Sequence, residues 1–139
     1  MAGRDGNGKA VTVLVVDDSR WFREAAASVV RATPGFDLVG EASTGEAAVR
    51  LADWLAPDIT LMDIRMPGLD GIAAARAIAA AHPSATIVLL TAGRPVDLEE
   101  TPPDTVAATL DKRELRPGAL EALWRAAQER AHARNGSAV

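Results

Sequence analysis

Two short apolar runs, each ended by acidic residues, constrain the fold of this chain more than any other feature. Residues 11–16 are followed by Asp17 and Asp18, and the run over 58–62 is followed by Asp63. Each run has the length and the β-branched composition of a strand buried on both faces, which indicates a parallel sheet. Ligands of open parallel sheets bind outside the carboxyl ends of the strands. If the two strands are neighbours, the three carboxylates converge at that edge.

Such a convergence requires something that compensates the negative charge. Two carboxylates about 4 Å apart repel by about 4 kcal/mol at an effective dielectric constant near 20. The cluster therefore needs a cation, a proton or a wide opening to solvent. A hard divalent cation with oxygen ligands is the simplest solution, and Mg²⁺ suits a site with few carboxylates and several waters.

The composition agrees with one small domain. The chain has 139 residues, of which 48% are hydrophobic, enough for a single core. A net charge of −4 argues against direct nucleic-acid binding, and the absence of Cys excludes disulfides and thiolate metal sites. The start resembles no signal peptide, and no run reaches the roughly 18 apolar residues of a membrane span. We therefore expect a cytoplasmic protein without membrane association.

Strands and helices are expected to alternate along a single domain over residues 11–132. The Gly-rich residues 1–10 are interpreted as a disordered lead and residues 133–139 as a disordered tail. Further strands are expected over 37–42, 85–90 and within 105–110. Helices are expected over 45–55, over 71–81, from near Pro117, and after Ser19, where the apolar face includes Phe22. This alternation predicts right-handed βαβ units and a doubly wound α/β sheet.

Two further polar side chains follow predicted strands. Thr91 ends the fourth apolar run and Lys112 follows the fifth. Lysine occurs only at positions 9 and 112, against 13 arginines. Because an ammonium and a guanidinium are not interchangeable, this bias suggests a specific role for Lys112. The predicted edge of the sheet thus carries three acids, a hydroxyl and an ammonium.

Four motifs carry a resemblance to a known family. They are Val16-Asp17-Asp18-Ser19, the run from Leu61 to Gly71 around Asp63, Leu89-Leu90-Thr91-Ala92 and Leu110-Asp111-Lys112. Over residues 11–130 the chain resembles the receiver domain of two-component response regulators. The resemblance implies a flavodoxin-like, five-stranded parallel sheet in the order 2-1-3-4-5. It also implies a phosphoacceptor in phosphorelay signal transduction, with at most intrinsic autophosphorylation from small phosphodonors and autodephosphorylation.

The resemblance also implies roles for individual residues. Asp63 would accept a phosphoryl group from a sensor histidine kinase. Asp17, Asp18, Asp63 and the backbone carbonyl of Arg65 would hold Mg²⁺, with Asp17 acting through water. At rest Lys112 would pair with Asp63. After phosphorylation it would contact the phosphoryl group.

Two residues after the fourth strand complete that implied site. The hydroxyl of Thr91 and the backbone N–H of Ala92 would also bind the phosphoryl group. Movement of Thr91 would then pass the signal to an unknown downstream protein through protein–protein contacts, and a homodimer is one form that contact could take. Few residues follow the last helix, so we expect a stand-alone receiver without a DNA-binding unit.

Three positions depart from the family pattern. Thr109 occupies the switch position, where receivers usually carry Tyr or Phe, and Arg113 follows the lysine, where many have Pro. Pro102 and Pro103 fall within the fourth helical segment, 93–104, and cannot lie inside a helix. We therefore expect a shortened or irregular fourth helix whose order changes on phosphorylation.

Several residues are assigned no chemistry. Trp54 and Trp124 are expected in the core or partly covered on helices, while Trp21 lies near the acids and could shade them. His82 and His132 are not expected to be ligands.

Two other functions remain open. One is an atypical receiver that acts as a phosphorylation-independent docking or dimerisation module, which the departures favour and the intact acids oppose. The other is a hydrolase that forms an aspartyl-phosphate. It would need an Asp-x-Asp pair and a cap insertion, and the chain has neither.

Overall fold

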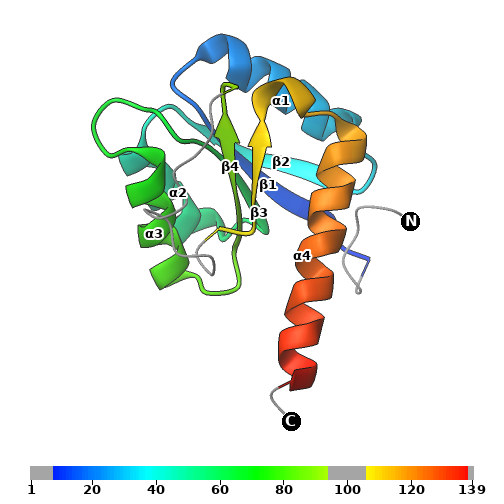
Figure 1. Ribbon diagram of the computed structural model, residues 1–139. Coiled ribbons are helices and arrows are strands. Elements are labelled where there is room, and N and C mark those ends of the chain that lie inside the picture. Colours follow the sequence, from blue (N-terminus) through cyan, green and yellow to red (C-terminus); the bar gives the residue numbers. More distant parts are fainter. Residues whose placement is uncertain (1–7, 94–105, 138–139) are drawn as a thin grey trace.

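A computed structural model describes residues 8–93 and 106–137 (Figure 1). The described residues form a five-stranded parallel sheet in the order β2-β1-β3-β4-β5, which confirms the expected doubly wound topology. The strands are β1 (Val11–Val16), β2 (Phe36–Ala42), β3 (Ile59–Asp63), β4 (Thr86–Thr91) and β5 (Ala108–Asp111).

Helices cover both faces of this sheet. They are α1 (Arg20–Ala32), α2 (Gly45–Leu55), α3 (Gly71–Ala81) and α4 (Pro117–Ser137), with a short 3₁₀ helix, η2 (Lys112–Glu114), after β5. Figure 1 shows α2 and α3 on one side of the sheet and α1 and α4 on the other. Side-chain oxygens of Ser19, Thr44 and Asp70 accept hydrogen bonds from backbone N–H groups in the first turns of α1, α2 and α3. The helix expected after Ser19 is therefore capped by that residue.

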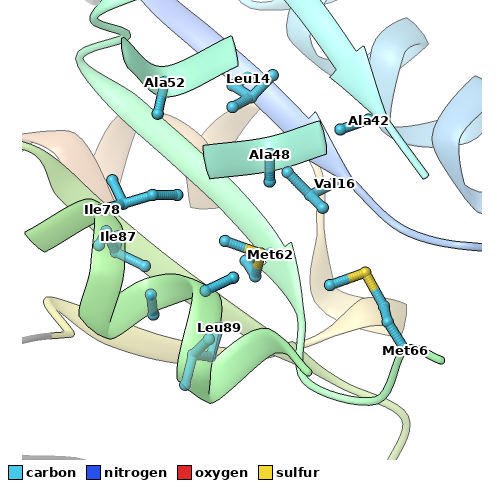
Figure 2. Packing of buried hydrophobic residues seen from close by; sticks show 12 residues of the cluster. Leu14, Val16, Ala42, Ala48, Ala52, Met62, Met66, Ile78, Ile87 and Leu89 are labelled. Atoms are coloured by element: carbon cyan, nitrogen blue, oxygen red, sulfur yellow. The ribbon is translucent and has the colours of Figure 1, made fainter. Parts of the chain in front are cut away.

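Alternation along β1 sends its side chains into two separate cores. Leu14 and Val16 face α2 and α3, whereas Val13 and Val15 face α1 and α4. Figure 2 shows the first of these cores, where Met62 of β3 lies among side chains of the neighbouring strands and of the two helices. Because β1 and β3 are buried on both faces, their ends are fixed tightly enough to position a site.

Close approaches of the backbone fix the loop that follows β3. A Cβ at Gly71 would collide with the carbonyl oxygen of Asp63, and a Cβ at Gly45 would collide with that of Leu69. The carboxylate of Glu46 accepts a hydrogen bond from the N–H of Leu69, at 2.9 Å. The starts of α2 and α3 thus hold the loop after Asp63 against the edge of the sheet.

Trp54 lies on the surface, so the expectation that it is covered was wrong. It is 83% exposed on α2 because Ala48 and Ala52 occupy the face of that helix that packs on the sheet. Trp124 is partly buried against the core under α1 and α4, as expected. Figure 1 shows α4 extending past the sheet to Ser137, so the domain end expected at residue 132 falls inside this helix.

The irregular fourth helix falls mostly on residues 94–105, which lie outside the described residues, and it stays a prediction. Among the residues that the structure describes, no helix is both long and apolar enough to cross a bilayer.

Thr60, in the middle of β3, gives a test of the packing. Its side chain is fully buried between Leu14 and Ile87 in the sheet, and its hydroxyl finds no hydrogen-bond partner among the described residues. An unpaired buried hydroxyl costs about 1–3 kcal/mol. We expect Thr60→Val to raise the free energy of unfolding by about 1 kcal/mol in urea denaturation.

Thr33 is the matched control, because its equally buried hydroxyl donates to the carbonyl of Val29 at 2.7 Å. Thr33→Val should lower the free energy of unfolding. Destabilisation by both substitutions would contradict this account of Thr60.

Candidate functional site

The three predicted acids converge at the carboxyl edge of the sheet. One carboxylate oxygen from each of Asp17, Asp18 and Asp63 lies within 4.8 Å of the others. They meet because β1 and β3 are parallel neighbours with Val16 opposite Met62, so both strands end at the same level. Asp17 and Asp63 are buried, whereas Asp18 is exposed. The group is thus open to solvent on one side.

Three hydrogen bonds hold Asp17 in position. Its N–H donates to the carbonyl of Ala42 at 3.0 Å, and its carbonyl accepts from the guanidinium of Arg23 at 2.7 Å. Its Oδ1 accepts from the N–H of Ser19 at 2.8 Å. The position of the buried carboxylate is therefore set by β2 and by the first turn of α1.

Lys112 reaches the acid group from the far edge of the sheet. Its Nζ lies 3.6 Å from Asp63 Oδ1, so the expected ion pair is present. A shorter contact of 2.5 Å joins it to Asp17 Oδ2, a partner that the sequence interpretation did not name. That oxygen accepts no well-aligned hydrogen bond among the described residues, so the ammonium is its charge partner.

The surroundings of Asp63 disfavour its ionised form. Burial raises the pKa of this carboxyl group, and the charge of Asp17 raises it further. Lys112 and a hydrogen bond from the N–H of Arg65, 3.3 Å from Asp63 Oδ1, act in the opposite direction without cancelling the effect. The acid group is thus short of positive charge.

The other predicted residues lie on β4 and β5. Thr91 is half-buried at the end of β4, opposite Asp111, and Ala92 follows on the surface. Since Leu90 is paired with Asp63, Thr91 lies one residue beyond the acid along the same edge. Thr109 is exposed, so no side chain at the switch position covers the sheet.

Sequence reasoning missed two contacts made by the first turn of α1. Arg23 holds the backbone of Asp17, and the ring of Phe22 lies under Lys112, with 4.6 Å between Nζ and the ring centroid. The start of a helix directly after Asp17 and Asp18 was the available signal, because helical side chains lean back toward the N-terminus. Trp21, by contrast, is 87% exposed.

Neither histidine is part of the acid group. His82 Nε2 is 2.8 Å from the carboxylate of Asp53, which joins the end of α3 to α2. His132 is exposed on α4.

Comparisons with known proteins agree with this geometry. The family model "Response regulator receiver domain" matches residues 13–110. A protein-glutamate methylesterase/protein-glutamine glutaminase 2 of Anaeromyxobacter dehalogenans (strain 2CP-C) is 43% identical over 84 residues, which are 60% of this chain and 25% of that protein. The transcriptional regulatory protein LiaR of Bacillus subtilis (strain 168) is 41% identical over 81 residues, 58% of this chain and 38% of that protein. The chain therefore spans well under half the length of these relatives.

Solved structures give the same fold over most of the chain. The signal receiver domain of the putative response regulator NarL from Mycobacterium tuberculosis has a TM-score of 0.77 and 30% identity, covering 86% of this chain and 98% of that one. The receiver domain of the histidine kinase CKI1 from Arabidopsis thaliana, complexed with Mg²⁺, has a TM-score of 0.63 and 29% identity. That alignment covers 76% of this chain and 84% of the CKI1 chain.

The raised pKa of Asp63 predicts a stability difference that depends on pH. A carboxyl group whose pKa is higher in the folded state destabilises the fold once it ionises, and this effect is absent below its unfolded pKa. In chelator at pH 7, Asp63→Asn should therefore raise the thermal unfolding midpoint. The gain should shrink as the pH falls toward about 4 and be absent below it, where Asp63 is protonated in both states.

The exposed Asp37 on β2 provides the control, and Asp37→Asn should leave the midpoint unchanged. Calorimetry between pH 3 and 7 measures both variants. An equal or lower midpoint for Asp63→Asn at pH 7, or a gain that grows in acid, would contradict this electrostatic account.

Proposed function

The chain belongs to the response regulator receiver domain family, and from this premise we propose that Asp63 accepts a phosphoryl group from the phosphohistidine of a sensor histidine kinase. The observation that supports it is the group of Asp17, Asp18 and Asp63 with Lys112 across its buried side. We do not assign methylesterase activity to this chain from its Anaeromyxobacter relative, because the chain matches only 25% of that protein.

The proposed step is a displacement at phosphorus. A carboxylate oxygen of Asp63 forms a bond to phosphorus while the phosphorus–nitrogen bond of phosphohistidine breaks, and the electron pair leaves with the imidazole. The product is a mixed anhydride that carries three phosphoryl oxygens. Lys112, 3.6 Å from Asp63 Oδ1, is within reach to compensate their charge, and we assign the hydroxyl of Thr91 and the N–H of Ala92 as donors to them.

The acid group fits a hard divalent cation. Its side-chain donors are carboxylate oxygens, and one from each of the three acids lies within 4.8 Å of the others. We assign Asp17, Asp18, Asp63 and the carbonyl of Arg65 to hold Mg²⁺. When bound, the metal supplies the charge that neutralises carboxylate and phosphoryl oxygens during transfer.

We propose that the signal passes from Thr91 to the segment after Gly93 and from there to a downstream protein or a second copy of the chain. The half-buried Thr91 ends β4, so a shift of its hydroxyl toward Asp63 displaces the backbone of Ala92. An exposed Thr109 offers no aromatic ring to follow that shift. The readout therefore depends on the backbone after β4.

A phosphorylation-independent docking module is the second candidate. The exposed Thr109 favours it, because the usual aromatic relay is missing. The intact charge arrangement around Asp63 favours phosphorylation, since a docking surface has no need of buried carboxylates that repel one another.

Intact-mass spectrometry after incubation with acetyl phosphate separates the two candidates. We expect one added phosphoryl group in the presence of Mg²⁺ and none in excess chelator. Asp63→Asn should abolish the label, whereas the surface control Asp37→Asn should keep it. A label that persists in Asp63→Asn, or forms equally fast in chelator, would reject the assignment of Asp63 and Mg²⁺, and the absence of any label would favour the docking module.

A further inference from the structure

We propose that Phe22 is a positioning residue whose aromatic face holds the ammonium of Lys112 over the acid group while that ammonium changes partners. This inference rests on the proposed phosphoacceptor function and adds a residue to it. Lys112 Nζ lies 4.6 Å from the centroid of the Phe22 ring, within the roughly 6 Å over which a cation and an aromatic face attract each other.

The need for such a hold follows from the other contacts of Lys112. Its ammonium contacts Asp17 Oδ2 and Asp63 Oδ1, which belong to the carboxylates assigned to the metal and the phosphoryl group. Once these oxygens engage other partners, a lysine on a flexible four-carbon stem loses both contacts. Reordering the stem then costs side-chain conformational entropy.

An aromatic face differs from the carboxylates in one respect that matters here. The aromatic face attracts a cation, but it does not ionise and has no lone pair that could coordinate the metal. Phe22 can therefore keep its contact with Lys112 before, during and after transfer. The ammonium then exchanges Asp17 for a phosphoryl oxygen without leaving the site.

The first turn of α1 holds Phe22 firmly enough for this role. The N–H of Phe22 donates to the side-chain oxygen of the cap, Ser19, at 3.3 Å. Its ring packs against the core under α1 and α4, and the next residue, Arg23, binds the carbonyl of Asp17 at 2.7 Å. One turn of helix thus fixes Asp17 from one side and the head group of Lys112 from the other.

A plain packing role for Phe22 is the competing explanation, and it makes a different prediction. Packing depends on the volume of the ring, whereas attraction to a cation depends on the negative charge of its face. Fluorine withdraws that charge from the face with little change of ring shape. A series of fluorinated phenylalanines therefore separates the two roles.

The test places phenylalanine and its mono-, di- and trifluoro analogues at position 22 of the full chain. We expect the rate of phosphorylation by acetyl phosphate with Mg²⁺ to fall stepwise, by about three- to tenfold over the series. The thermal unfolding midpoint should not fall. The same analogues at Phe36, the only other phenylalanine, should leave the rate unchanged because that ring belongs to the core on β2.

NMR of the Lys112 side chain gives a readout that needs neither metal nor phosphodonor. The protons next to Nζ should be shifted upfield by the ring in the wild type and in Phe22→Tyr, and should lose this shift in Phe22→Leu. The fluorinated series keeps the proposal testable if Phe22→Leu does not fold.

The outcomes separate this inference from the function on which it rests. A wild type that is phosphorylated while the fluorinated series stays flat would overturn the role of Phe22 and leave the proposed function intact. A wild type that takes no label would overturn the proposed function. In that case the upfield shift of the Lys112 protons alone tests the contact between Lys112 and the Phe22 ring. Absence of this shift in the wild type would reject the contact.

Discussion

The contact between the Lys112 ammonium and the buried carboxylate of Asp17 is the interaction on which the site depends. Asp17 is fully buried, and its Oδ2 has no other charge partner among the described residues. Without Lys112, the Asp17 carboxylate at the end of β1 would be an uncompensated buried charge beside Asp63. Such a charge destabilises the folded state because it is largely removed from water. The parallel register of the sheet brings the two acids together, and the cation that contacts them comes from another strand end. Lys112, placed directly after β5, supplies it.

Arg113 follows Lys112 directly, at the position where many receivers have proline, and it stabilises the chain there. The backbone N–H of Arg113 donates to Asp111 Oδ1 at 2.8 Å, and its guanidinium reaches Oδ2 at 2.8 Å. Hydrogen bonds from Arg113 lower the pKa of Asp111 to about 2, so this carboxylate stays ionised at ordinary pH. A Cβ at Gly93 would lie 3.5 Å from the same guanidinium. Arg113 thus holds the turn after β5 and lies near Gly93, which follows β4.

The sequence predicted the meeting of the acids because that meeting follows from strand ends alone. The apolar runs gave the strands, and in a parallel sheet adjacent ends share one edge. It did not predict that Lys112 lies closer to Asp17 than to Asp63, because side-chain direction past a strand end is not encoded in spacing. The spacing of apolar residues placed Phe22 on the apolar face of a helix. That spacing could not show that the Phe22 ring contacts Lys112. Trp54 was misassigned because alanines fill the core side of α2.

The central claim is that Lys112 moves from Asp17 to a phosphoryl group on Asp63 while Asp17, Asp18 and Asp63 hold Mg²⁺. A crystal structure with Mg²⁺ and beryllofluoride, a phosphoryl mimic, tests this claim most directly. The account predicts beryllium bonded to Asp63, a magnesium ion among the three carboxylates, and Lys112 Nζ in contact with fluoride and still over the ring of Phe22. A structure in which the mimic is bound while Lys112 remains on Asp17, or in which the metal lies away from the three acids, would contradict it.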